Sequence, residues 1–339
     1  MGLHYPFTDP PGTGNAVSIT PDVKWLRSPL PISLGHINCY LLRDGDGWCV
    51  LDTGMNGAAA RQQWLDVIET ELQGAPLTRV IVTHHHPDHV GLAGWLCDRF
   101  RIPLYMSESE YFQSLAFNAP RRSQPYWEVD QYFARAGMSL DSQQSLYAND
   151  DYNHMVSEMP ASYHRITDGQ RVRIGDFEWQ AITTRGHAPE HLSLYCRERN
   201  LYISGDQLLP KITSNVSVSP VAPEADPLAD WLDAHDKLTA IVPDEATVLP
   251  AHQLPFTGVH VRAAQVVHHH QQRMDQIHTL CQQPATAQVL TEKLFDRKLD
   301  AFQNFLAVGE CMAHLHRLLA LGRVERTLTE GVYHFRALT

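Results

Sequence analysis

The stretch THHHPDHVGL (residues 83–92) gathers four histidines and one aspartate directly after an apolar run, RVIVT (residues 79–83). Because side chains alternate along an extended chain, His84 and His86 should point to one side of the backbone and His85 to the other. Two imidazoles on the same side can converge on one metal ion. We therefore expect His84 and His86 to bind an ion. We expect His85 not to bind it, and replacement of His85 by alanine should cost little.

The second half of the stretch has the features of a helix start. Pro87 suits the first turn of a helix, where its missing N–H is not needed. Asp88 and His89 would then point in neighbouring but different directions, which suits a second ion beside the first. A histidine-rich loop can also be a plain polar loop, and isolated histidines usually belong to such loops.

The segments around the stretch predict a layered α/β domain. Residues 36–54 contain two apolar runs separated by Asp-Gly-Asp-Gly, a strong hairpin signal, and residues 58–72 have the apolar spacing of a helix. Residues 103–166 form a long, polar, aromatic-rich segment that we interpret as a helical insertion. After residue 255 the pattern predicts three helices and a hairpin around Glu330 and Gly331, an arrangement similar to a winged helix.

The H-x-H-x-D-H pattern closely resembles the signature of the metallo-β-lactamase superfamily. Three later motifs follow in the order that this family requires: TTRGHAPEH with His187, LYISGDQL with Asp206 and TVLPAHQL with His252. The last motif reads PAHQ where many relatives have PGHG, so the local turn differs although the histidine remains. The resemblance covers roughly residues 17–256.

This resemblance implies an α/β fold, specifically a four-layer αββα metallo-β-lactamase sandwich with a helical insertion and a small C-terminal winged-helix-like domain. We expect a catalytic domain over residues 1–256, with the insertion at 103–166, and a C-terminal domain over residues 257–339.

The resemblance also implies a ligand set for two divalent metal ions. One ion would be held by His84, His86 and His187, the other by Asp88, His89 and His252, and Asp206 would stand between them. Nitrogen and oxygen ligands suit zinc, with iron or manganese as alternatives. Asp52, in LDTG, and His191 would support the ligands, although Asp52 could equally be a turn residue after a strand.

Two such ions can share a water molecule and present a bridging hydroxide as the nucleophile. Asp88 and Asp206 would orient it or take part in proton transfer. We therefore expect a binuclear metal-dependent hydrolase, acting most readily on a small or medium acyl ester or thioester.

Two further residue groups bear on the substrate. Tyr126 and Trp127, in the insertion, could line an apolar cover over the metals or simply pack the insertion, while Arg121, Arg122 and Lys211 could contact a carboxylate or phosphate of the substrate. The expected partner is a small acyl compound. The C-terminal domain would serve a structural role or form a homodimer.

Other activities fit the same motif. The C-terminal domain resembles that of the β-lactamase-like protein 2 group, some of whose members cut single-stranded RNA, so a nuclease or phosphodiesterase is the main alternative. Residues 255–339 carry nine Arg or Lys and seven Asp or Glu, a net charge of +2, so with a total of −11 the remaining chain carries −13. Such an acidic region would repel an RNA backbone. A mononuclear-iron dioxygenase or a non-catalytic binding protein fits less well.

The remaining features are expected to be structural. Consecutive histidines on a helix point about 100° apart, so His268, His269 and His270 cannot converge on one ion and should lie at the surface or in grooves. His314 and His316 should likewise be ordinary helix residues. Six scattered cysteines, the lack of a basic and apolar leader, and the lack of a long apolar run indicate a cytoplasmic protein with no membrane segment.

Overall fold

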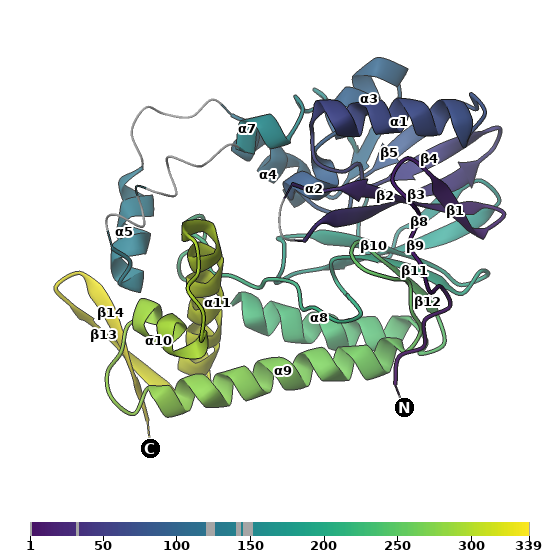
Figure 1. The fold of residues 1–339 in the computed structure, drawn as a ribbon. Helices are drawn as coiled ribbons and strands as arrows, with labels where there is room; N and C mark the ends of the chain where they lie inside the picture. The colour runs from purple at the N-terminus through teal and green to yellow at the C-terminus, as the bar shows by residue number, and fades with distance from the viewer. Residues whose placement is uncertain (1, 32–33, 120–125, 140–143, 145–151, 339) are drawn as a thin grey trace. The chain divides into compact units, whose positions relative to one another are not determined.

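A computed structural model describes residues 2–31, 34–119, 126–139, 144 and 152–338 (Figure 1). The described residues form two compact units. The first contains residues up to 119, residues 152–214 and residues 238–263, and the second contains the described part of 120–150 together with 215–237 and 264–338. The boundaries of these packing units differ from the expected domain boundary at residue 256. The division into two domains at that residue stays a prediction. The insertion residues Arg121 and Arg122 lie outside the described residues.

The first unit contains two sheets. Neighbouring strands of the larger sheet follow the chain order: β1 (Ala16–Thr20), β2 (Val23–Pro29), β3 (His36–Asp44), β4 (Gly47–Leu51), β5 (Leu77–Ile81), β6 (Leu104–Met106) and β7 (His164–Arg165). The smaller sheet has the order β12 (Thr247–Pro250), β11 (Leu201–Gly205), β10 (His191–Cys196), β9 (Phe177–Thr184) and β8 (Arg171–Ile174). The predicted hairpin is confirmed, since Asp44 pairs with Gly47 across the β3–β4 turn.

The hairpin end of β3 is anchored by Asp44. Its carboxylate accepts hydrogen bonds from the Thr78 hydroxyl at 2.7 Å, from the Gly175 N–H at 2.9 Å and from Arg79 at 2.6 Å. Burial alone would raise the pKa of Asp44, but these hydrogen bonds and the Arg79 charge lower it. Asp44 thereby ties the larger sheet to the β8–β9 turn of the smaller one.

Three apolar cores divide the first unit into four layers. One core lies between the larger sheet and α1 (Ala58–Thr70) and α3 (Ala93–Phe100), which cover one face of that sheet in Figure 1. A second core joins the two sheets through buried residues such as Trp25 and Trp179. A third packs the smaller sheet against residues 238–242 and 259–263, the ends of two helices within this unit. The helix–sheet–sheet–helix order confirms the predicted αββα sandwich.

Short helices complete the first unit. They are α2 (Pro87–Val90), α4 (Glu108–Asn118) and α7 (Tyr152–Met155). The predicted helix start at Pro87 is confirmed, because this proline occupies the first turn of α2 behind an extended His86. Two longer helices, α8 (Pro227–Ile241) and α9 (Val259–Leu280), contribute residues to both units.

The second unit has its own apolar core, built from α5 (Trp127–Ala136), α9, α10 (Ala287–Leu294), α11 (Ala301–Ala320) and the hairpin β13 (Val324–Thr329) and β14 (Val332–Ala337). Three C-terminal helices followed by a hairpin are therefore confirmed, while the winged-helix comparison stays a prediction. An Asp300 capping box starts α11 by satisfying its first N–H groups. None of the helices in the described parts of the chain combines the length and apolar character needed to cross a membrane.

Candidate metal centre

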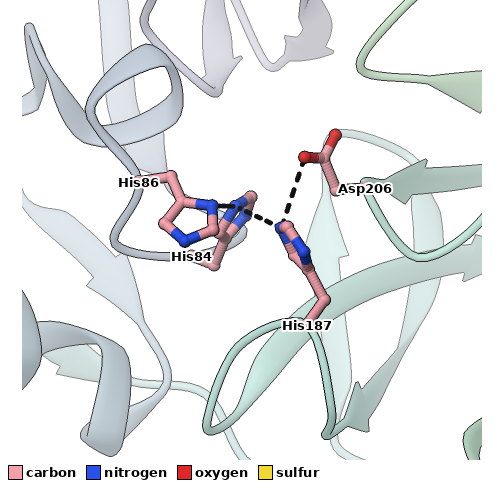
Figure 2. Close-up of side chains that lie close together, drawn as sticks. All are labelled: His84, His86, His187 and Asp206. Carbon is pink, nitrogen blue, oxygen red and sulfur yellow. Dashed lines mark hydrogen bonds and ion pairs between the residues drawn. The ribbon is translucent and has the colours of Figure 1, made fainter. Parts of the chain in front are cut away.

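The loop between β5 and α2 delivers the histidines as the alternation argument predicts. His84 and His86 turn toward the smaller sheet and meet His187, which follows β9, and Asp206, which follows β11. In Figure 2 the three imidazoles and the carboxylate point toward one another from these separate segments. Sequence distance is no guide to this contact, because the sandwich brings loops of both sheets to one edge.

The four side chains form the first donor group. His84 Nε2 lies 2.9 Å from His86 Nδ1 and 3.2 Å from His187 Nε2, and His187 Nε2 lies 3.3 Å from Asp206 Oδ2 (Figure 2). One atom from each side chain falls within 4.8 Å of the others. Separations of this size are those between neighbouring ligands on one small ion.

The second donor group lies on the other side of Asp206. It consists of Asp88 and His89 from α2 and His252 after β12. Asp88 Oδ2 is 3.5 Å from His252 Nε2 and 3.7 Å from His89 Nε2. Asp206 faces this group too, with Oδ1 3.3 Å from His252 Nε2 and Oδ2 3.6 Å from His89 Nε2. All seven predicted ligands therefore come together in two adjoining groups, with Asp206 between them.

Asp52 holds the histidine loop through hydrogen bonds to Thr83 and His89. It is buried, its backbone adopts the left-handed φ of 56°, and its carboxylate accepts hydrogen bonds from the Thr83 N–H at 2.8 Å and the Thr83 hydroxyl at 2.9 Å. His89 Nδ1 donates to the same carboxylate at 2.8 Å. The Thr83 oxygen also lies 3.0 Å from His84 Nδ1 and can accept its proton. Both rings then turn an unprotonated Nε2 toward the donor groups. A strained backbone at such a position is typical of functional sites.

His252 is oriented by a residue that the sequence analysis missed. Its Nδ1 donates to the backbone oxygen of His36 at 2.8 Å, which leaves Nε2 free of its proton. His36 Nε2 in turn accepts the Gln253 N–H at 2.9 Å. Gln253, the last residue of PAHQ, has a φ of 71°, the conformation that favours glycine. Side-chain contacts therefore hold a turn that glycine adopts more easily.

His191 contacts the backbone of Asp206. Its Nε2 accepts the Asp206 N–H at 3.1 Å, and burial followed by the neighbouring His187 lowers its pKa to about 4, so the ring is neutral. Gly205 comes close to this ring with a φ of 54°, and a Cβ at residue 205 would lie 2.6 Å from His191 Nε2. Glycine is needed here both for the backbone angle and for the approach.

His85 points away from both groups, as expected, but it is not a passive residue. Its Nδ1 and Glu110 Oε2 are 2.5 Å apart, and the His85 N–H donates to the same oxygen at 3.0 Å. The other Glu110 oxygen accepts the Glu190 N–H at 2.6 Å. Burial alone would raise the pKa of Glu110, but these contacts lower it. The small cost expected for loss of His85 does not fit this buried network, which no local sequence signal indicates.

The charges of the site call for a cation. Burial and then the neighbouring histidines lower the pKa values of His84 and His86. Burial also opposes charge on His89, yet three surrounding carboxylates, those of Asp88, Asp52 and Asp206, raise its pKa. Burial would raise the pKa of Asp206, but His252 and His89 hold it well below its usual range. The site thus gathers carboxylates and imidazoles in a poorly hydrated place, where the carboxylates around His89 favour a positive charge.

Several buried atoms of this site form no hydrogen bond among the described residues. They are His89 Nε2, His252 Nε2 and Asp206 Oδ1. Buried polar atoms ordinarily have partners, and these three face one another across the second donor group. The residues present therefore fit divalent metal ions, and their imidazole and carboxylate set suits zinc, iron or manganese.

The residues expected to contact the substrate belong to both units. The Lys211 N–H donates to Gln253 Oε1 at 3.0 Å, so this exposed lysine is tethered next to the residue that follows His252. Tyr126 and Trp127 belong to the second unit and are 54% and 66% exposed. Phe117 of α4 stacks on His85 with ring centroids 5.5 Å apart, which places an aromatic residue beside the histidine loop.

A two-sheet sandwich that presents His and Asp ligands at one edge defines a metal-dependent hydrolase of the metallo-β-lactamase type. The chain belongs to the metallo-beta-lactamase superfamily, whose sequence pattern matches residues 32–252. The pattern of the metallo-beta-lactamase-like C-terminal domain matches residues 274–338. The protein is therefore a metallo-hydrolase of this superfamily with a candidate metal-binding cluster.

Similar proteins agree with this assignment. The chain is 25% identical over 316 residues to the probable metallo-hydrolase YqjP of Bacillus subtilis (strain 168), covering 89% of this chain and 93% of that protein. A beta-lactamase domain protein from Burkholderia ambifaria superposes with a TM-score of 0.92 at 37% identity, covering 99% of this chain and 98% of that one.

Two more similar proteins bear on the resemblance seen in the sequence. A metallo-beta-lactamase family protein from Thermus thermophilus superposes with a TM-score of 0.80 at 26% identity, covering 95% of this chain and 100% of that one. The chain is 22% identical to a beta-lactamase-like protein 2 homolog of Caenorhabditis elegans, over 56% of this chain and 50% of that protein. The predicted family resemblance is confirmed.

Proposed function

We propose that the protein is a binuclear metal-dependent hydrolase that acts on a small or medium acyl ester or thioester. The observation that carries this proposal is the position of Asp206. Its Oδ2 lies 3.3 Å from His187 Nε2 of the first donor group, while its Oδ1 lies 3.3 Å from His252 Nε2 of the second. One carboxylate that faces both groups suits two ions held side by side.

Bound ions would lower the pKa of a water molecule and polarise the substrate carbonyl. The chain's own residues would position the reactants. Asp88 is only partly buried and its Oδ2 faces His252, so it can accept a proton from the attacking water and return it to the leaving group. Asp52 and His191 would hold the loops of His89 and Asp206 in place during this transfer.

The substrate class is supported by two residues of the first unit. Phe117, stacked on His85, would offer an apolar surface at the histidine loop, and Lys211, whose backbone N–H is bound to the Gln253 side chain, would offer a positive charge to an anionic group of the substrate. The formal net charge of −11 disfavours a long phosphate backbone. Together these features favour an acyl compound over a nucleic acid.

The test is a hydrolysis panel on the full chain loaded with zinc, manganese or iron. The substrates are coenzyme A and glutathione thioesters of increasing acyl length, nitrophenyl esters and a nitrophenyl phosphodiester. We expect metal-dependent release of thiol or nitrophenol from the acyl substrates. Asp206→Asn should lower kcat by about 100-fold or more, since proton transfer and orientation contribute factors of that order. Lys211→Gln should raise KM for charged thioesters with little change in kcat.

The matched control is Asp98→Asn, because the Asp98 side chain is 80% exposed and pairs only with Arg101 at the surface among the described residues. Its kcat should equal that of the unaltered protein. Metal-dependent cleavage of the phosphodiester alone would reject the acyl substrate and make single-stranded RNA the next substrate to assay. A protein that binds no metal ion would reject the binuclear site as well.

A further inference from the structure

A second set of possible ligands lies outside the candidate metal centre. It consists of His270 on α9 and of Glu310 and His314 on α11, and one ligand atom from each side chain falls within 4.8 Å of the others. All three residues belong to the second unit, whereas the candidate metal centre belongs to the first. This histidine–glutamate cluster is therefore separate from the proposed hydrolytic site.

The sequence brings these residues together through two helices. Glu310 and His314 are four positions apart, so they lie on the same face of α11. Residues of α9 such as Met274 and Ile277 share a buried core with Val308 and Leu315 of α11. This packing turns His270 toward α11. It is fully buried, contrary to the surface or groove position expected from the sequence, while His268 two positions earlier is exposed.

The three side chains are oriented as ligands of one ion would be. His314 Nδ1 donates to the backbone oxygen of Glu310 at 2.7 Å, which leaves Nε2 as the acceptor nitrogen. That Nε2 lies 3.1 Å from His270 Nδ1. The Glu310 carboxylate accepts a hydrogen bond from Asn215 Nδ2 at 3.2 Å. Histidine ligands commonly donate their other ring N–H to a carbonyl, and carboxylate ligands are commonly hydrogen-bonded in turn.

A plain hydrogen bond between the two rings explains less of this arrangement. It accounts for His270 Nδ1 and His314 Nε2 but not for the neighbouring Glu310 carboxylate, while His270 Nε2 is buried with no hydrogen bond among the described residues in either case. Glu310 would then lie beside the rings with a hydrogen bond from Asn215. Its carboxylate forms no ion pair with Arg273 in the part of the chain that the structure describes. A metal ion would supply a positive charge to this half-buried carboxylate beside the two imidazoles.

We propose that His270, Glu310 and His314 bind one divalent transition metal ion, with zinc as the preferred ion. Two imidazoles and one carboxylate form a donor set that zinc favours, and the partial exposure of Glu310 leaves access for a water molecule as the fourth ligand. The ion would link α9 to α11 inside the second unit. Its role would be structural, because it stabilises the packing of the helices that carry its ligands.

The experiment measures zinc per chain in a full-length background with the candidate metal centre disabled by His84→Ala and His252→Ala. The protein is equilibrated with zinc, separated from free ion by gel filtration and analysed by mass spectrometry of the metal. We expect about one zinc ion per chain in this background. Adding Glu310→Gln, which keeps the side-chain shape and the contact with Asn215, or His270→Gln should remove it.

The matched control is His268→Gln on the same helix, which should leave the zinc content unchanged. Cobalt in place of zinc should give visible bands of a four-coordinate site in the background and lose them in Glu310→Gln. Absence of zinc from the background would overturn the proposal, as would zinc that survives both Glu310→Gln and His270→Gln or is lost in His268→Gln. None of these results depends on hydrolytic activity, so the proposal can fail or stand independently of the proposed function.

Discussion

Replacement of Glu110 by alanine should destabilise the first unit by about 3–5 kcal/mol. The Glu110 side chain is fully buried and accepts three hydrogen bonds, from the N–H and Nδ1 of His85 and from the N–H of Glu190. Alanine leaves these donors without an acceptor, and each unpaired buried group costs about 1–3 kcal/mol.

The assay is urea unfolding followed by tryptophan fluorescence, because Trp25, Trp64 and Trp179 are buried in the first unit. The matched control is Glu108→Ala, in the same first turn of α4, whose side chain is 46% exposed and pairs with Arg165 at the surface. Such surface pairs contribute about 0–1 kcal/mol. The destabilisation caused by Glu110→Gln should lie between those of the two alanine variants. The amide oxygen of glutamine can accept one of the hydrogen bonds, but its NH2 group would face another donor.

Amide hydrogen exchange provides a local test of the same reasoning. The N–H groups of His85 and Glu190 should exchange faster in Glu110→Ala and stay protected in Glu108→Ala. A destabilisation below about 1 kcal/mol, together with unchanged protection of both amides, would show that Glu110 does not hold the histidine loop to β10.

Three further perturbations test other parts of the structure. Asp52→Asn should weaken zinc binding by about 10- to 100-fold in competition with a chelator, because residues that orient ligands have effects of that size; unchanged affinity would contradict the role assigned to Asp52. Gly205→Ala should destabilise the protein in urea unfolding by more than Gly45→Ala, since both glycines have positive φ but only Gly205 would direct a Cβ into His191; equal effects would leave backbone strain as the sole cause. The lowered pKa of Asp44 means that its contribution to stability is present above the unfolded pKa of about 4 and is lost as the pH falls through the folded pKa. Between pH 7 and pH 3 the urea midpoint of Asp44→Asn should therefore fall less than that of the parent protein, because the stability difference between the two, ~2 kcal/mol or less, disappears. Midpoints that fall in parallel for variant and parent would argue against this linkage.

The sequence predicts the sandwich well, and the candidate ligands that it indicates come together in the structure, because both depend on short patterns. Alternation along the chain places His84 and His86 together, and the proline rule starts α2 at Pro87. Each later motif is weak alone, yet His187 and Asp206 follow strand patterns in the order the family requires. The structure brings all seven candidate ligands to one edge of the two sheets.

What the sequence does not predict depends on contacts between distant segments. Glu110 meets His85 across 25 positions, and His36 meets His252 across 216 positions, with no local pattern that marks either pair. The burial of His270 likewise depends on how α9 packs in the second unit. Helical periodicity shows that neighbouring histidines diverge, but it does not show which partner from another helix one of them meets.

The Thr83 hydroxyl has a thermodynamic consequence for the order in which ions enter the site. Its oxygen lies 3.0 Å from His84 Nδ1 and 3.2 Å from His89 Nδ1, so one atom touches a ring from each donor group. An ion that fixes either ring also fixes the hydroxyl and lowers the entropy cost of fixing the other ring. If two ions bind as proposed, the two binding events would be positively cooperative, and linkage requires that each ion strengthen the other by the same factor. At limiting zinc, such cooperativity favours chains with both donor groups filled over chains with one.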